Sequence, residues 1–357
     1  MDRVYNFNAG PSAMPLEVLQ EARAEFLNYK NTGMSIIEMS HRSPEYAAMH
    51  AETKALLRQL MEIPDDYEIL FIQGGGSLQF LMTAANFFTN KRAAYANTGV
   101  WAKKAMAEAK RFGEAYEACT SADKNHSYIP QELTIKPDTA YLHITANNTI
   151  YGTQWQEFPD VSVPVICDMS SDILCRPVDI KKFSLIYAGA QKNLGPAGVV
   201  IVIVKKAFLE TARTDLPPML SYQNYADNDS LYNTPPVFAI YMVNKTLHWI
   251  KAQGGVKAIA ARNREKTQLI YDVIDASRGF YRGHAEKNSR SLMNITFNLP
   301  TQELEKDFIA EGKKRGFIGI GGHRLVGGCR VSAYNAVTPE ACRAIADFMK
   351  EYQAKHE

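Results

Sequence analysis

The chain has 357 residues, 46% of them hydrophobic and 22% charged, so it can bury a large core and form roughly two domains. Its 40 basic and 38 acidic residues leave a net charge of +2, which argues against a nucleic-acid surface or a polybasic membrane anchor. No apolar run could span a bilayer, and the N-terminus lacks the apolar core of a signal peptide, so we expect a cytoplasmic protein. The 5 cysteines contain no C-x-x-C pair, so neither a disulfide framework nor a metal site is predicted.

The chain begins with an extended, turn-rich lead over residues 1–14. Pro15 suits the start of a helix because its fixed φ is already helical and its missing N–H has no partner there. The pattern that follows carries Leu16, Leu19 and Phe26, which we expect to form the apolar face of a first helix.

A second helix is predicted after Ser43, whose side chain suits an N-cap and is followed by proline. Its apolar face is formed by Met49, Thr53, Leu56, Leu57 and Leu60. His41 and Arg42 directly precede this helix. Such a pair is usually a hydrated loop end, but a guanidinium beside a helix N-terminus is also a good anion site. The choice between the two depends on what lies opposite.

Residues 68–109 read as strand, turn, helix, strand, turn and helix, which predicts an α/β fold with a parallel sheet. The first turn, Q-G-G-G-S-L-Q, follows an apolar run, and its glycines allow backbone N–H groups to approach a phosphate. The dinucleotide fingerprint G-x-G-x-x-G fails because Gln79 stands where glycine is needed, and the G-K-[ST] of a P-loop is absent. The turn therefore predicts a phosphate without naming a nucleotide.

Three more side chains follow predicted strands. Trp101 comes after a glycine turn; such a residue is more often core, but its ring could also stack on a heteroaromatic ligand. Thr149 lies in a polar loop after a strand predicted at residues 140–145. Asp168 ends a strand predicted at residues 163–167, where a carboxylate needs a cationic or hydrogen-bonding partner. It either caps the next turn or pairs with a protonated ring nitrogen.

Residues 187–198, Y-A-G-A-Q-K-N-L-G-P-A-G, lie between two apolar runs that read as buried strands. Lys192 is therefore predicted at a strand end, where α/β sheets bind ligands. Alone, it is as easily a solvated turn residue as a nucleophile activated by desolvation. A lysine together with an aspartate for a pyridine nitrogen is what proteins contribute to pyridoxal phosphate chemistry. A phosphate turn, a stacking ring, Asp168 and Lys192 together are much rarer by chance than any one of them.

The last third predicts a smaller α+β domain. Its elements are a strand at 291–299, a helix at 301–315, strands at 317–320 and 329–334, and a final helix from 338. The glycine-rich segment 321–330 carries His323, Arg324 and Arg330, which are either surface charges or, for the arginines, bidentate clamps for a carboxylate and a phosphate. We expect a large domain over residues 16–250 and a small domain over residues 1–15 plus 251–357.

Several motifs resemble those of the phosphoserine aminotransferases, which are class-V, fold-type I pyridoxal-phosphate enzymes. They are F-N-A-G-P, S-H-R-S, Q-G-G-G, N-T-P-P-V-F-A, G-H-R-L-V-G-G-C-R and the lysine segment, and they are spread over almost the whole chain. The resemblance implies a large, mostly parallel-sheet domain, a smaller α+β domain, and a homodimer with shared active sites. It implies amino transfer between O-phosphoserine and 2-oxoglutarate in serine biosynthesis, and leaves open a phosphohydroxythreonine-type substrate in pyridoxine biosynthesis.

The same resemblance implies roles for individual residues toward the cofactor. Lys192 would bind pyridoxal phosphate covalently, Asp168 would pair with its pyridine nitrogen, and Trp101 would stack on its ring. The other cofactor contacts, to the phosphate and the phenolic oxygen, would be Gly76, Ser77, Gln191, Thr149 and, from the partner subunit, Asn233 and Thr234. Some family members carry arginine after the triple glycine, where this chain has Ser77.

On the substrate side, the resemblance implies that Arg330 binds the α-carboxylate. Around the distal phosphate or carboxylate it implies a cluster, partly from the other subunit, of His41, Arg42, His323 and Arg324. Other functions are weighed against this one. A cysteine desulfurase would need a cysteine in an exposed electropositive loop, an oxidoreductase fails the fingerprint above, and a non-catalytic relative would have lost Lys192 and Asp168.

Overall fold

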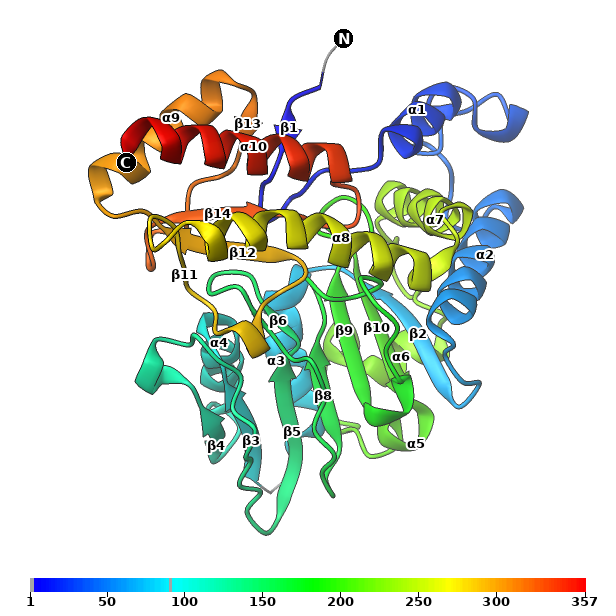
Figure 1. Cartoon of the computed structure of the whole chain (residues 1–357). Helices are drawn as coiled ribbons and strands as arrows, with labels where there is room; N and C mark the ends of the chain where they lie inside the picture. The colour runs from blue at the N-terminus through cyan, green and yellow to red at the C-terminus, as the bar shows by residue number, and fades with distance from the viewer. Residues whose placement is uncertain (1–2, 90–91) are drawn as a thin grey trace.

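The computed structural model describes residues 3–89 and 92–357, which form two lobes (Figure 1). Residues 1 and 2 of the expected lead and small domain lie outside the described residues. The described α-helices are α1 (Leu16–Glu25), α2 (Pro44–Met61), α3 (Gly75–Phe87), α4 (Val100–Ala109), α5 (Lys206–Leu209), α6 (Tyr222–Asp227), α7 (Val237–Ala252), α8 (Gly255–Ala276), α9 (Gln302–Lys314) and α10 (Pro339–His356). The described strands are β1 (Tyr5–Asn6), β2 (Tyr67–Ile72), β3 (Arg92–Asn97), β4 (Ala115–Thr120), β5 (Thr139–Thr145), β6 (Asn147–Asn148), β7 (Thr153–Gln154), β8 (Val165–Asp168), β9 (Leu185–Gly189), β10 (Val200–Lys205), β11 (Arg282–Gly283), β12 (Asn294–Asn298), β13 (Phe317–Ile318) and β14 (Cys329–Ser332).

The larger lobe is built on a seven-stranded sheet with the order β2-β10-β9-β8-β5-β3-β4. The strands run parallel except β10, which is antiparallel to both of its neighbours, β2 and β9. The expectation of a mostly parallel sheet is confirmed, and β10 is its exception. The physical reason is the short connection between β9 and β10, because a parallel pair would need a crossover of a dozen or more residues.

Both faces of this sheet are buried, because successive strand residues point to opposite sides. In β2, for example, Ile69 and Phe71 join the core beneath α2 and α7, whereas Leu70 and Ile72 join the core beneath α3 and α4. In Figure 1 these two helix layers lie on opposite sides of the sheet. The apolar runs of the sequence therefore read correctly as buried strands.

The smaller lobe has a core of its own, made by the antiparallel sheet β11-β12-β14 and by α8, α9 and α10. The N-terminal strand β1 pairs in parallel with β13, and Phe7 packs into this second core. Helix α8 joins the lobes, since Val256 and Ile259 belong to the large core but Ile270 and Ile274 to the small one. The expected boundaries between the two domains stay a prediction.

The expected face of the first helix is correct for Leu19, which packs against the large core, but wrong for Leu16 and Phe26. Helix α1 buries Val18 and Ala22, whereas Leu16 and Phe26 are 46% and 40% exposed. The cause is tertiary: α1 packs against α7, where Lys245 forms ion pairs with two glutamates of α1.

Helix boundaries agree better with the sequence. The Ser43 hydroxyl accepts a hydrogen bond from the Tyr46 N–H at 3.2 Å, and Thr338 caps α10 in the same way. Gly316 ends α9 with a φ of 84°, a conformation that glycine adopts without strain. The 22-residue helix α8 and the strand β4 were not anticipated. None of the helices described is both long and apolar enough to cross a membrane.

Candidate active site

The residues singled out in the large lobe meet because they follow strands that run in one direction. The carboxyl ends of parallel strands lie at the same edge of a sheet, so the segments after β2, β3, β5, β8 and β9 come together there. The segments after β2, β3, β5 and β9 carry Ser77, Trp101, Thr149 and Lys192, and Asp168 is the last residue of β8.

A cavity of about 360 Å³ lies at this edge. Of the residues predicted for the site, its lining contains Gly76, Ser77, Trp101, Thr149, Asp168, Gln191, Lys192, His323 and Arg330. The last two come from the small lobe, from the β13–β14 connection and from β14. The site therefore lies between the two lobes, and the glycine-rich segment at residues 321–330 closes one side of it.

Lys192 and Asp168 both line this cavity, and the charge of each shifts the pKa of the other. Burial raises the pKa of the Asp168 carboxyl, an effect that the charge of Lys192 and hydrogen bonds from Ser170 oppose. Burial lowers the pKa of the Lys192 amine. The positive charge of Arg330 lowers this pKa further, whereas the negative charge of Asp168 raises it. Among the ion pairs of the described residues, none within 4.0 Å includes Asp168. The carboxylate, only 8% exposed, is thus left without a direct cationic partner.

Asp168 also caps the turn that follows it. One of its carboxylate oxygens accepts the backbone N–H of Ser170 at 2.9 Å, and the Ser170 hydroxyl accepts the N–H of Gly189 at 3.1 Å. The structural and the functional interpretation of Asp168 are therefore compatible. The hydrogen bonds orient the carboxylate, and the cavity leaves its other face available.

The N-terminus of α3 opens into the same cavity. Gly74 precedes the helix with a φ of 87°, and no side chain caps the first turn. The first backbone N–H groups of a helix have no partner inside it, and together with the helix dipole they attract anions. Gly76 and Ser77 belong to this turn and line the cavity. The glycine turn therefore lies at the cavity, and its expected contact with a phosphate stays a prediction.

Trp101 is connected to the small lobe through hydrogen bonds. Its indole Nε1 donates to Thr149 Oγ1 at 3.2 Å, and the Thr149 carbonyl accepts from Arg330 Nη1 at 2.9 Å. Burial lowers the pKa of the Arg330 guanidinium, and its Nε has no hydrogen-bond partner in the described residues. A half-buried guanidinium with donors to spare is suited to a carboxylate.

Sequence reasoning missed residues that hold the lysine segment. Ser12 donates its hydroxyl to the Lys192 carbonyl at 2.6 Å, and Gly10 lies so close that a Cβ there would meet the lysine side chain at 3.5 Å. The side chain of Asn193 accepts the N–H of Asn335 at 3.1 Å. The F-N-A-G-P motif, which contains Gly10 and directly precedes Ser12, was a usable signal for these two, but no local pattern singles out Asn335.

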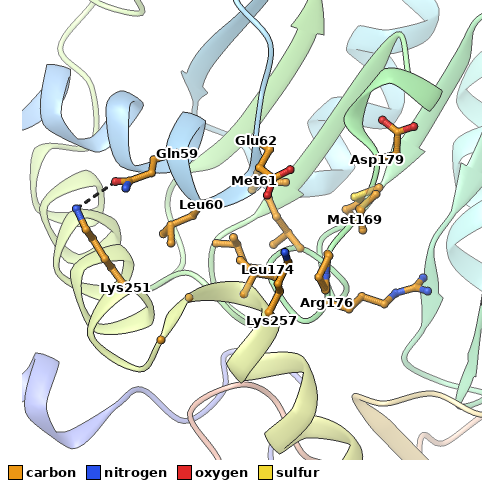
Figure 2. A pocket seen from close by; sticks show the side chains of 16 residues that line it. Gln59, Leu60, Met61, Glu62, Met169, Leu174, Arg176, Asp179, Lys251 and Lys257 are labelled. Carbon is orange, nitrogen blue, oxygen red and sulfur yellow. Dashed lines mark hydrogen bonds between the residues drawn. The ribbon is translucent and has the colours of Figure 1, made fainter.

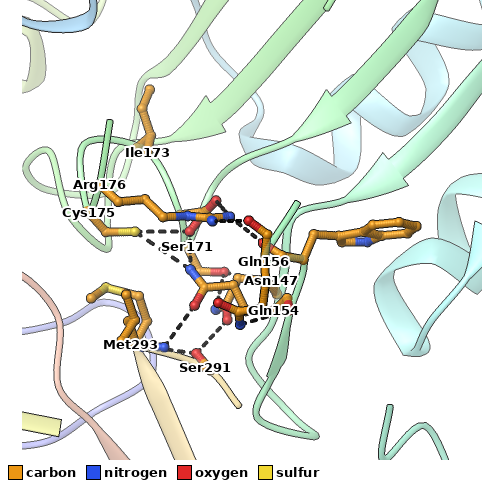
Figure 3. Close-up of polar contacts among 12 residues, drawn as sticks. Asn147, Gln154, Gln156, Ser171, Ile173, Cys175, Arg176, Ser291 and Met293 are labelled. Carbon is orange, nitrogen blue, oxygen red and sulfur yellow. Dashed lines mark hydrogen bonds and ion pairs between the residues drawn. The ribbon is translucent and has the colours of Figure 1, made fainter. Parts of the chain in front are cut away.

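A buried polar network borders the cavity, and Figure 3 shows its hydrogen bonds. The Asn147 amide donates to Ser171 at 2.9 Å and to Asn294 at 2.8 Å, and it accepts the hydroxyl of Ser291 at 2.5 Å. Asn147 and Ser171 also line the cavity. The network therefore joins the cavity wall of the large lobe to the sheet of the small lobe.

The other predicted site residues do not line this cavity. They are His41, Arg42, Asn233, Thr234 and Arg324. Asn233 and Thr234 instead contact Gln73 at the start of the glycine turn, at 3.3 and 3.1 Å. The cavity thus contains all the residues expected to contact the cofactor except Asn233 and Thr234, which were expected to act from a partner subunit. Of the four residues expected around the distal anion, it contains only His323.

A larger cavity of about 670 Å³ lies elsewhere, between the end of α2 and the start of α8 (Figure 2). Its floor is apolar, with Met169 and Leu174 buried, and Lys251 is hydrogen-bonded to Gln59 at its edge. Its lining has no counterpart of the buried Lys192 and Asp168. The smaller cavity is therefore the candidate active site, because of the residues that line it and not because of its size. No group of histidine, cysteine, aspartate and glutamate in the described residues has the arrangement of a metal site.

Comparison with known proteins agrees with this geometry. The model of the family "Aminotransferase class-V" matches residues 4–344. Phosphoserine aminotransferase of Bacillus subtilis (strain 168) is 55% identical over 359 residues, which cover 100% of both chains. The chain belongs to the phosphoserine aminotransferase family.

Solved structures of this family have the same fold. Phosphoserine aminotransferase from Bacillus circulans subsp. alkalophilus is 52% identical, with a TM-score of 0.98 and 100% of both chains covered. The PLP-bound phosphoserine aminotransferase from Trichomonas vaginalis is 38% identical, with a TM-score of 0.93 over 98% of this chain and 100% of that chain. The predicted family and fold class are confirmed.

Membership of the phosphoserine aminotransferases removes the alternatives left by the sequence. The cysteine desulfurase alternative also fails on the structure, since Cys119 is the one cysteine of the described residues that is not buried. Burial raises the pKa of its thiol to about 12, so it is a poor nucleophile.

Proposed function

We propose that the chain is a pyridoxal-phosphate-dependent aminotransferase that converts O-phosphoserine and 2-oxoglutarate to 3-phosphohydroxypyruvate and glutamate, and back, in serine biosynthesis. The observation that carries this is the meeting of Lys192, Asp168 and the α3 N-terminus in one cavity of a phosphoserine aminotransferase fold. A phosphohydroxythreonine-type substrate and a cytoplasmic location stay predictions.

The residues of the cavity fit pyridoxal phosphate. Asp168 is a buried carboxylate without a direct cationic partner, as a protonated pyridine nitrogen requires. The uncapped α3 N-terminus with Gly76 and Ser77 suits the phosphate, and Gln191, Trp101 and Thr149 line the space between. Lys192 would hold the cofactor through its amine. When bound, pyridoxal phosphate supplies a carbonyl that takes the amino group and a ring that accepts electrons from the substrate Cα.

The chain's own residues then move one proton and hold another. The amine of Lys192, whose pKa is lowered by burial, would take the proton that leaves the substrate Cα and pass it to the cofactor carbon that takes up the amino group. In the second half of the reaction it would move a proton the opposite way, onto the Cα of the keto acid. Asp168, oriented by Ser170, keeps a proton on the ring nitrogen. Arg330, held by Thr149, binds the α-carboxylate that all these substrates share.

The distal phosphate needs further cations, and we propose that some come from a second subunit. His323 lines the cavity and Arg324 is its neighbour in the chain. His41 and Arg42 do not line their own cavity, which supports the expectation that they act in the partner's. Asn233 and Thr234 are proposed to reach the partner's cofactor phosphate in the same way.

Exposed apolar side chains that precede His41 and Arg42 in the chain support a homodimer. They are Leu16, Phe26, Leu27, Met34 and Ile37. Leu27 is 81% exposed and Ile37 54%, which is costly for an isolated subunit. Leu27→Asp with Ile37→Asp should give monomers in sedimentation experiments and lose activity, whereas Val4→Asp at another exposed apolar residue should remain dimeric. A monomeric wild-type enzyme would contradict the proposal.

The function is tested by the visible absorption of the protein purified with its cofactor. O-phosphoserine alone should change the spectrum, 2-oxoglutarate should restore it, and Lys192→Ala should abolish turnover. A protein that takes up no pyridoxal phosphate contradicts the cofactor; one that takes it up but ignores O-phosphoserine contradicts the substrate.

A further inference from the structure

Lys104 lies beside the active-site cavity without having been assigned any part in it. It follows Trp101 by one turn of α4, and its Nζ lies 4.8 Å from the centroid of the indole ring. Trp101 lines the cavity. An ammonium at this distance from an indole is attracted by the negative face of the ring, so the lysine has a preferred position beside the cavity.

The charge of Lys104 is not neutralised by the chain. Its side chain is exposed, and none of the ion pairs within 4.0 Å among the described residues includes it. The indole that carries it is fixed in turn, since its Nε1 donates to Thr149, and Thr149 accepts from Arg330. A continuous series of contacts therefore connects Lys104, through Trp101 and Thr149, to Arg330, the residue proposed to bind the α-carboxylate.

The positive charge of Lys104 also influences the pKa of His323, a residue of the small lobe that lines the cavity. Burial lowers the pKa of His323, and the charges of Arg330, Arg324 and Lys104 lower it further. His323 lines the cavity and belongs to the group proposed for the distal anion. The preceding lysine, Lys103, differs: its charge lowers the pKa of His126 instead.

We propose that Lys104 is a specificity-determining residue that favours the phosphorylated substrate over glutamate. This inference rests on the function proposed above. A phosphate monoester carries a charge of about −1.5 to −2 at pH 7, whereas the distal carboxylate of glutamate carries one negative charge. An unpaired ammonium beside the indole that lines the cavity therefore attracts the phosphate more strongly. Lys104 comes from the same subunit as Lys192, so the discrimination needs no residue from the partner.

The test compares Lys104→Gln with Lys103→Gln, which removes the same charge from the next position of α4. The holoenzyme is mixed with O-phosphoserine or with glutamate alone, and the second-order rate constant of each half-reaction is measured. Lys104→Gln should lower the constant for O-phosphoserine about 3- to 10-fold and that for glutamate less than about 2-fold. Lys103→Gln should leave both unchanged, and Lys104→Arg should restore the discrimination.

Salt provides a second readout that a purely structural role would not affect. The rate constant of the wild-type enzyme for O-phosphoserine should fall more steeply with ionic strength than that of Lys104→Gln. Equal losses for both substrates would mean that Lys104 acts only by supporting Trp101, and would overturn the proposal. So would a Lys104→Gln enzyme that behaves like Lys103→Gln. A wild-type enzyme inert toward O-phosphoserine would instead refute the proposed function, before any lysine is changed.

Discussion

Arg330→Lys would keep a positive charge in the cavity but remove the planar fork of the guanidinium. In the native chain Nη1 is committed to the Thr149 carbonyl at 2.9 Å and the remaining donors are left for a ligand. A bidentate contact with the substrate α-carboxylate then contains one charge-assisted hydrogen bond that lysine cannot reproduce, worth about 1.5–3 kcal/mol. At about 1.4 kcal/mol per tenfold change, kcat/KM should fall roughly 10- to 100-fold. Arg330→Gln also removes the charge, and should cost about 2–5 kcal/mol.

The assay uses both amino donors, because the α-carboxylate is common to them. O-phosphoserine and glutamate should lose rate by the same factor in their separate half-reactions. Arg282→Gln is the matched control, since Arg282 is exposed on β11 and donates to the carbonyl of Leu299 in the small lobe. A loss for O-phosphoserine with glutamate unaffected would place Arg330 at the distal anion and refute its assignment to the α-carboxylate.

Two further predictions concern stability. Burial lowers the pKa of Lys266 from 10.5 to about 7 in the folded chain. Between these two pH values the unfolded chain binds more protons at Lys266 than the folded chain does. The free energy of unfolding that Lys266 contributes therefore rises with pH in this range. The difference in urea stability between Lys266→Met and the native chain should therefore change by up to about 1.4 kcal/mol per pH unit from pH 7 to 9; a constant difference would contradict the shift. Gly319 and Gly316 have φ values of 81° and 84°, but only at Gly319 would a Cβ lie 2.7 Å from the backbone nitrogen of Asn8. Gly316→Ala should cost about 1–2 kcal/mol and Gly319→Ala clearly more, and equal unfolding midpoints would contradict the crowding.

The strand ends were predictable because the signals there are local. Apolar runs followed by glycine or a lone polar residue mark the end of a buried strand, and Asp168 and Lys192 stand at such places. Once the strands are taken as parallel, their carboxyl ends share an edge, and the cavity follows. The assignment of Trp101 and Thr149 to the same cavity needed the resemblance as well, because neither residue type is specific on its own.

What the sequence could not supply depends on contacts between distant segments. The exposed face of α1 is set by α7, so the apolar spacing of Leu16 and Phe26 was misleading. The antiparallel β10 depends on the length of one connection, and Asn335 reaches Asn193 only through the fold. Residues expected to act across subunits cannot be placed by a single chain at all.

The position of the small lobe decides whether Arg330 and Lys192 can act on one substrate, because they come from different lobes. Polar contacts between the lobes hold it, among them Asn335 to Asn193 at 3.1 Å, Asn294 to Asn147 at 2.8 Å and Ser291 to Asn147 at 2.5 Å. Apolar packing tolerates small sliding, whereas directional hydrogen bonds between buried groups specify one arrangement. Each contact touches a segment next to Lys192 or the cavity wall. The distance between the proton-transferring amine and the carboxylate clamp is thus set by buried polar groups, which accounts for their concentration beside the site.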